Sequence, residues 1–183
     1  MNVTGAKRRN GVLEHIDNDD IFTYDFQFDE QYVLDVFNRD YRGKGTPYVD
    51  PRLQGMDELF YGEDWGGWLI HRDVNDPYIW SLCELFGVNA SPRFFLQVPG
   101  FDLPQHTDHG TQCSINFLIG GNNPAPIRCG KNVYHYKTAL LNVQEYHGVD
   151  NPDEERLLLK LAIQDEDYFS VREKMVSILS AGI

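Results

Sequence analysis

The spacing of apolar residues separates a helical first part of the chain from a strand-rich second part. Over residues 28–41 apolar side chains recur at helical spacing, and Asp29 is placed to cap the first turn. A second helix is predicted to begin at Pro77 and to end before Gly87. Residues 43–66 are rich in Gly, Pro and Asp, which predicts a long surface connection and a candidate substrate lid.

The second part of the chain alternates short apolar runs with turns. Residues 113–119 place Cys, Ile, Phe and Ile on one face and Ser, Asn and Leu on the other, as in a strand. Roughly eight short strands favour a sandwich or barrel over a parallel sheet with alternating helices. The predicted strands cover residues 68–70, 93–98, 113–119, 127–129, 133–136, 139–143, the segment at His147, and 156–163, with at most one more near 11–15.

These elements, with a closing amphipathic helix over residues 168–179, predict a mainly β fold with flanking helices. The architecture that fits best is a double-stranded β-helix (jelly roll, cupin-like). At 183 residues the chain has the length of one domain. We expect a single domain over 1–183, with a helical and loop-rich N-terminal embellishment (1–92), a β-helix core (93–164) and a C-terminal helix (165–183).

Composition and charge narrow the classes of partner. The chain is 42% hydrophobic and 24% charged, as in ordinary globular proteins. Its net charge of -12 argues against nucleic acid as a partner, because phosphate binding depends on lysine and arginine. No apolar run approaches the length of a membrane span, so we expect no membrane partner. The three cysteines lack C-x-x-C spacing and lie in apolar contexts, which predicts reduced thiols and a cytoplasmic protein.

One constellation carries recognisable chemistry. His106 and Asp108 follow a Pro-Gly turn, and His147 lies further along the chain. Alternate residues of a strand share a face, so His106 and Asp108 can both point inward, with His147 as a third ligand from across the barrel. Two imidazoles and a carboxylate on one face of Fe(II) leave its other positions open for a bidentate cosubstrate and O2. The sequence therefore predicts a metal site of these three residues.

A basic side chain is predicted to anchor the cosubstrate. Arg156 begins the last apolar run, and an inward arginine on a barrel strand needs an anionic partner. The C5 carboxylate of 2-oxoglutarate would satisfy it. Lys160 has the same strand parity and is the alternative anchor, while Asn116 is a candidate second contact from the polar side of its strand.

The remaining polar and aromatic residues have simpler interpretations. His109 has the wrong parity for the His106 face, although it could orient Asp108. Arg93 and Arg128 are interpreted as surface salt-bridge residues. Structural or packing roles are expected for the other histidines and for the tryptophans, one of which could wall the pocket: His15, His71, His135, Trp65, Trp68 and Trp80.

From about residue 93 to 163 the chain resembles the Fe(II)- and 2-oxoglutarate-dependent dioxygenases. More narrowly, it resembles the aspartyl/asparaginyl β-hydroxylase-like and prolyl-hydroxylase-like branches. The aspartyl hydroxylases have a glycine where this chain has Asp108, and a basic residue where it has Asn116. The matching segments are Pro99-Gly100, Pro104-x-His106-Thr107-Asp108, Thr111-Gln112-Cys113, Ile127-Arg128-Cys129, His147-Gly148-Val149-Asp150-Asn151 and Arg156-Leu157-Leu158-Leu159.

The resemblance implies an oxygenase that uses Fe(II), 2-oxoglutarate and O2. Such an enzyme hydroxylates a C–H bond, here of a small molecule or of an amino-acid or peptide side chain, and releases succinate and CO2. The alternative is a cupin-like metal or small-molecule binding protein without redox turnover, because the same barrel hosts many functions. Such a protein would not need the inward Arg156. A zinc-dependent isomerase or lyase is a third possibility, disfavoured because zinc sites usually carry more histidines.

Overall fold

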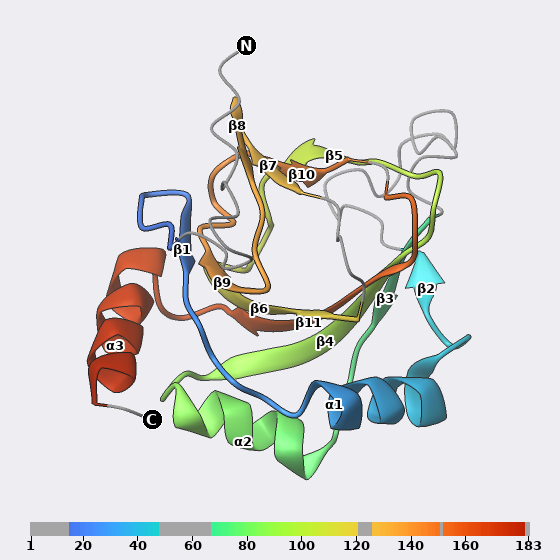
Figure 1. The fold of residues 1–183 in the computed structure, drawn as a ribbon, viewed down its shortest axis with the longest axis horizontal. Coiled ribbons are helices and arrows are strands. Elements are labelled where there is room, and N and C mark those ends of the chain that lie inside the picture. Colours follow the sequence, from blue (N-terminus) through green and yellow to red (C-terminus); the bar gives the residue numbers. More distant parts are fainter. Residues whose placement is uncertain (1–14, 48–66, 121–125, 151, 182–183) are drawn as a thin grey trace, which may run out of the picture.

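Two antiparallel sheets lie face to face, and helices cover the outer face of the larger sheet (Figure 1). The computed structural model describes residues 15–47, 67–120, 126–150 and 152–181. Within these residues the larger sheet has seven strands, in the order β1-β9-β6-β11-β4-β3-β2, and the smaller has four, in the order β5-β10-β7-β8. This is the double-stranded β-helix that the sequence predicts.

The strand and helix bounds follow the predicted order closely. The larger sheet contains β1 (Ile21–Thr23), β2 (Thr46–Pro47), β3 (Trp68–His71), β4 (Ala90–Gln97), β6 (Cys113–Ile119), β9 (Thr138–Leu141) and β11 (Arg156–Ile163). The smaller sheet contains β5 (Leu103–His106), β7 (Ile127–Cys129), β8 (Asn132–Tyr134) and β10 (His147–Val149). The helices are α1 (Glu30–Val36) with its π-helical continuation η1 (Phe37–Tyr41), α2 (Pro77–Leu85) and α3 (Tyr168–Ser180).

Each α-helix begins directly after an aspartate. The side chains of Asp29, Asp76 and Asp167 accept hydrogen bonds from backbone N–H groups of the first turn. These caps satisfy donors that have no partner inside the helix, which fixes where each helix starts. The helices predicted from apolar spacing are thereby confirmed. None of the helices in the described part of the chain is long and apolar enough to cross a membrane.

The larger sheet is buried on both faces, and each face belongs to a different core. On β6, Cys113, Ile115, Phe117 and Ile119 pack in a core that includes residues of all three α-helices. The alternate residue Leu118 packs between the two sheets. The same alternation continues on β11, so its odd-numbered residues face the helices and Leu158 faces the smaller sheet. Side chains on this inner face are the ones that can form a site inside the barrel.

The structure corrects the start of β4. The prediction placed its beginning at Arg93, after Pro92, whereas the strand starts at Ala90 and pairs with β11 along its whole length. The ladder between β3 and β4 covers only residues 94–97. Pro92 therefore lies where β4 has no partner on the β3 side, the edge position in which a strand accommodates proline.

The N-terminal part of the chain contributes more strand than predicted. Besides β3, which was predicted at 68–70, the short strands β1 and β2 of this part also join the larger sheet. β2, at Thr46–Pro47, pairs with β3 and so replaces the beginning of the predicted connection. The rest of that connection, residues 48–66, and most of the predicted strand near 11–15 lie outside the described residues.

Candidate metal centre

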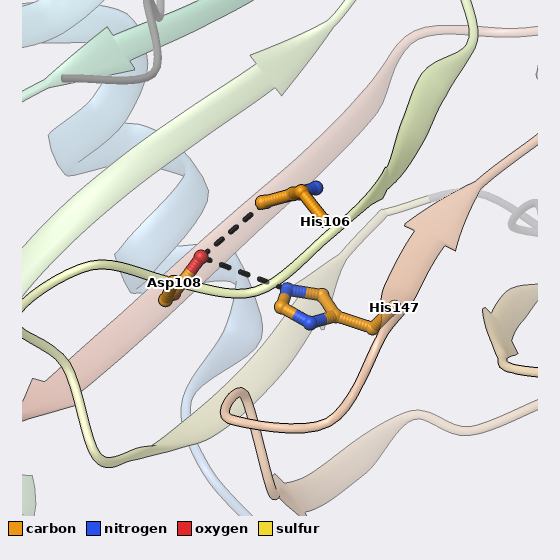
Figure 2. A group of neighbouring side chains, drawn as sticks. All are labelled: His106, Asp108 and His147. Carbon is orange, nitrogen blue, oxygen red and sulfur yellow. Dashed lines mark ion pairs between the residues drawn. The ribbon is translucent and has the colours of Figure 1, made fainter. Parts of the chain in front are cut away.

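Three predicted ligands converge at one end of the smaller sheet. His106 is the last residue of β5 and His147 the first of β10, and the two face each other in the ladder between these strands. Asp108 follows β5, where its backbone N–H donates to the carbonyl of Val143 at 2.9 Å. The Oδ1 atom of Asp108 lies 3.3 Å from Nε2 of His106 and 3.7 Å from Nε2 of His147 (Figure 2). All three potential ligand atoms lie within 4.8 Å of one another.

A glycine lets the two histidine-bearing strands approach each other. A Cβ atom on Gly148 would lie 2.6 Å from the carbonyl oxygen of Leu103 on β5. Real side chains do not tolerate such a contact with backbone, so a larger residue would push β10 away from β5. Gly148 therefore helps to set the distance between His106 and His147.

Backbone carbonyls orient both imidazoles. Nδ1 of His106 lies 2.8 Å from the carbonyl oxygen of Pro104, and Nδ1 of His147 lies 3.0 Å from that of Glu145. A carbonyl can only accept, so in both bonds Nδ1 donates its hydrogen. With Nδ1 as the donor, Nε2 is the ring atom left to bind a metal, and in both histidines it is the nitrogen that lies next to Asp108.

Asp108 divides its two oxygens between two sets of partners. Oδ1 faces the histidines, whereas Oδ2 accepts a hydrogen bond from the Lys160 ammonium on β11. Both side chains are buried. The ion pair therefore holds the carboxylate so that one oxygen remains directed at the imidazoles.

The charges around the site favour the forms that bind a metal. Burial by itself would raise the pKa of Asp108, but the nearby Lys160, His106 and His147 together lower it. Burial lowers the pKa of His147 to about 4 and outweighs the attraction to Asp108. At neutral pH the carboxylate is ionised and this imidazole is neutral, which are the states that coordinate a divalent metal.

A second polar group lies in the same cavity. Arg156, only 3% exposed, donates from Nη2 to the hydroxyl oxygen of Tyr136 at 3.0 Å. The Nδ2 atom of Asn116 donates to the same oxygen at 3.4 Å. The guanidinium also lies 5.8 Å from the ring centroid of Trp68, at cation–π distance.

Some polar atoms of this second group have no partner. Within the described part of the chain, Nε and Nη1 of Arg156 and Oδ1 of Asn116 are buried and accept or donate no hydrogen bond. Leaving charged donors unsatisfied in a protein interior costs free energy. The arrangement suits a ligand carboxylate, which would accept from the planar guanidinium fork.

The two groups face one cavity of about 90 Å³. Its wall contains the three predicted ligands, Arg156, Asn116 and Lys160, all of which sequence reasoning had named. Lys160, predicted as an alternative anchor, contacts the carboxylate of Asp108. Trp68 packs between the sheets, as was expected of the tryptophans, and also forms part of the wall, as was expected of one of them.

Tyr136 is a site residue that sequence reasoning missed. The sequence predicted it as the last residue of a strand over 133–136, whereas β8 ends at Tyr134 and Tyr136 lies between β8 and β9, where the alternation of a strand does not assign its side chain. Among ten tyrosines in the chain, nothing in the sequence distinguishes it. Only its contacts with Arg156 and Asn116 do so.

Arg93, interpreted as a surface salt-bridge residue, lies on the wall of the cavity. Arg93 is partly buried, lies opposite Lys160 in the ladder of β4 and β11, and lines the cavity. Its parity with Phe95, which packs between the sheets, was the signal that could have shown this. Arg128, in contrast, forms the expected surface ion pair, with Asp150.

None of the other described histidines forms an ion pair with Asp108. His109 is exposed, lines the cavity, and makes no hydrogen bond to Asp108 among the described residues. His71 is buried and packs edge-on against Phe37 on the helix side of the sheet. Neither His15 nor His135 lines the cavity.

Comparison with known proteins supports the fold. No family model matches the sequence, and no curated protein is detectably similar to it. A prolyl-4-hydroxylase from Pseudomonas putida superimposes with a TM-score of 0.53 at 15% identity, covering 74% of this chain and 85% of that chain. At this identity the likeness concerns the fold alone, and it agrees with the double-stranded β-helix described above.

More distant structures are also similar to parts of the chain. An oxidoreductase of the 2OG-Fe(II) oxygenase family from Burkholderia pseudomallei has a TM-score of 0.39 at 14% identity, covering 55% of this chain and 70% of that chain. An RmlC-like cupin protein from Ralstonia eutropha has a TM-score of 0.36 at 11% identity, covering 66% and 80%.

Proposed function

We propose that this protein is an Fe(II)- and 2-oxoglutarate-dependent dioxygenase that hydroxylates a C–H bond of a small molecule or of an amino-acid or peptide side chain. The observation that carries the proposal is one cavity holding both a buried His-Asp-His group and a buried arginine with unpartnered nitrogens. When bound, iron and 2-oxoglutarate supply the redox chemistry, which consumes O2 and releases succinate and CO2.

The protein contributes ligands and orientation. Nε2 of His106 and of His147 and Oδ1 of Asp108 would hold the metal, a donor set that suits non-haem Fe(II). The carbonyls bonded to both Nδ1 atoms keep the imidazoles in the ligating tautomer. The buried apolar wall around them limits access of water.

A separate group would bind the cosubstrate. Arg156 would receive the C5 carboxylate of 2-oxoglutarate, with the Tyr136 hydroxyl and Asn116 beside it. This favours a dioxygenase over the alternative, a cupin-like binding protein without redox turnover, because a plain metal site gives no reason to bury an incompletely paired arginine. The predicted resemblance to the aspartyl/asparaginyl β-hydroxylase-like and prolyl-hydroxylase-like branches points to the same chemistry.

The organisation and location of the protein are part of the proposal. We propose one domain over residues 1–183, with the β-helix core at 93–164. All three cysteines are free and buried, and burial raises the pKa of Cys83 to about 11 and those of Cys113 and Cys129 to about 12. Free thiols suit a reducing compartment, so we propose a cytoplasmic location.

The decisive experiment is anaerobic spectroscopy of the wild-type protein. Adding Fe(II) and 2-oxoglutarate together should produce a weak visible charge-transfer band that neither produces alone. Protein that binds Fe(II) but shows no such band would contradict the proposal. Succinate formation in air, measured against 2-oxoglutarate consumption, then tests turnover.

A variant of Asp108 connects the band to the site. Asp108→Asn is preferable to Asp108→Ala, because the carboxamide still offers the buried Lys160 ammonium a hydrogen-bond acceptor. The variant should fold and lose the band. His109→Gln, which replaces an exposed imidazole on the same cavity, serves as the control and should keep it.

A further inference from the structure

The inner face of β11 carries a second buried cation that the proposed cosubstrate does not require. Lys160 is 8% exposed and has the same parity as Arg156, four residues along the strand. At the rise of an extended strand their Cα atoms are about 13 Å apart. Arg156 contacts Tyr136 and Trp68, whereas Lys160 contacts Asp108 and lies 5.6 Å from the ring centroid of Phe95. The two cations therefore face different parts of the cavity.

In the part of the wall that the structure describes, positive charges outnumber negative ones. Besides Arg93, this part of the wall holds three cations and one carboxylate: Arg72, Arg156, Lys160 and Asp108. A divalent metal and the dianion of 2-oxoglutarate offset each other, so the same excess of positive charge persists in a loaded site. This excess is local, because the chain as a whole carries a net charge of -12. A cation concentration of this kind attracts an anion.

Metal binding would leave Lys160 in particular short of negative charge. Asp108 is its ion-pair partner, and the same carboxylate would then also neutralise the metal. A buried ammonium is costly unless it is paired. Lys160 lies beside the metal ligand, where a substrate must also come, and Arg93 lies opposite it in the ladder of β4 and β11. Arg72 extends this positive wall to an exposed position.

We propose that the substrate is an anion whose carboxylate or phosphate group is bound by Lys160, with Arg72 at the outer part of the same wall. The inference rests on the proposed function, since it assigns Arg156 to 2-oxoglutarate and Lys160 to the substrate. It narrows the substrate class to acidic small molecules or acidic side chains. Lys160 is then a specificity-determining residue of the reaction.

The experiment uses inorganic phosphate and acetate as probes of the two oxyanion types. Mn(II) replaces Fe(II), 2-oxoglutarate is saturating, and the paramagnetic relaxation of the 31P or 13C signal reports an anion bound near the metal. We expect saturable relaxation by at least one of the two anions, which also tells phosphate from carboxylate. Lys160→Met should weaken that binding by about tenfold or more, as expected for loss of a charged hydrogen bond. Lys160→Arg should retain most of it.

Two controls separate the role of Lys160 from other effects. Lys131→Met removes an exposed lysine that lies outside the cavity wall and should behave as wild type. With Mn(II) kept saturating, the 2-oxoglutarate affinity of Lys160→Met should fall less than its affinity for the anion, because Arg156 remains. A large fall in that affinity, without a change in anion binding, would assign Lys160 to the cosubstrate and overturn the inference.

The remaining outcomes distinguish this inference from the proposed function. If neither anion binds saturably, or if Lys160→Met binds it as tightly as wild type, the anion site is wrong even where the Fe(II)–2-oxoglutarate band is present. Conversely, saturable anion binding that depends on Lys160, in a protein that gives no such band, would support the anion site and contradict the dioxygenase.

Discussion

The two faces of β11 are buried alike but have different chemistry. Toward the helices, Leu157, Leu159, Leu161 and Ile163 are at most 5% exposed and pack only in an apolar core. Toward the smaller sheet, the alternate positions carry Arg156 and Lys160 at 3% and 8% exposure. One strand thus belongs to the core of the fold on one side and to the wall of the cavity on the other.

The contrast separates what stabilises the fold from what the site requires. Apolar burial contributes about 25 cal/mol for each Å² removed from water, so the helix-facing residues stabilise the protein. Burying a guanidinium and an ammonium is unfavourable unless each finds an anionic partner. Leucines at the positions of Arg156 and Lys160 would therefore stabilise the fold more than these two cations do. Ligand binding offers a physical reason for these two residues that packing does not.

The largest expected effect on stability comes from the helix-facing side. Leu159→Ala removes a fully buried side chain, and the cavity it leaves should lower the free energy of unfolding by about 2–5 kcal/mol. Urea denaturation followed by circular dichroism measures this. Val176→Ala, at a 42% exposed position on α3, is the control and should change stability by less than about 0.5 kcal/mol. Equal effects of both changes would mean that this face is not the core.

On the cavity side, His147 should make the free energy of unfolding of the metal-free protein depend on pH. The pKa of His147 is lowered from 6.5 to about 4 in the folded state, so the unfolded chain binds more protons between these values. Stability from this residue is then fully present above pH 6.5 and is lost as the pH falls toward 4, by on the order of 3 kcal/mol. Asp108 acts in the same direction only below its ordinary pKa of 3.8.

Unfolding measured in urea at pH 7, 5.5 and 4.5, with a chelator present, tests this slope. His147→Gln should flatten the dependence across this range. His109→Gln, at an exposed position, should keep the wild-type slope. A wild-type slope in His147→Gln would show that other groups cause the acid sensitivity.

A substitution of Arg156 should weaken 2-oxoglutarate binding with only a small effect on the stability of the fold. Arg156→Met keeps much of the side-chain volume and removes the incompletely paired charge, so stability should stay within about 1 kcal/mol of wild type or rise. The affinity for 2-oxoglutarate should fall by about tenfold to a hundredfold, because charged hydrogen bonds to the carboxylate are lost. Titration of the charge-transfer band measures that affinity. Unchanged affinity would contradict the anchor assignment.

Much of the β-helix could be predicted because its long strands carry a clear alternation. The bounds of β11 agree with the prediction at both ends, and the two-face pattern of β6 is confirmed by the two cores. β1 was not predicted, since three residues are too few to show a period. Its place in the sheet comes from pairing with β9, far along the chain.

The sequence by itself determined the residue types of the site and their parity. His106, Asp108 and His147 could be named because metal ligation needs those side chains, and Arg156 and Lys160 because strand periodicity places them on one face. The tertiary structure decided which of them meet. It put Lys160 against Asp108, joined Tyr136 to Arg156, and brought Arg93 inside. These contacts depend on how strands far apart in sequence pair across the barrel. A local pattern of residues does not encode which distant strands pair.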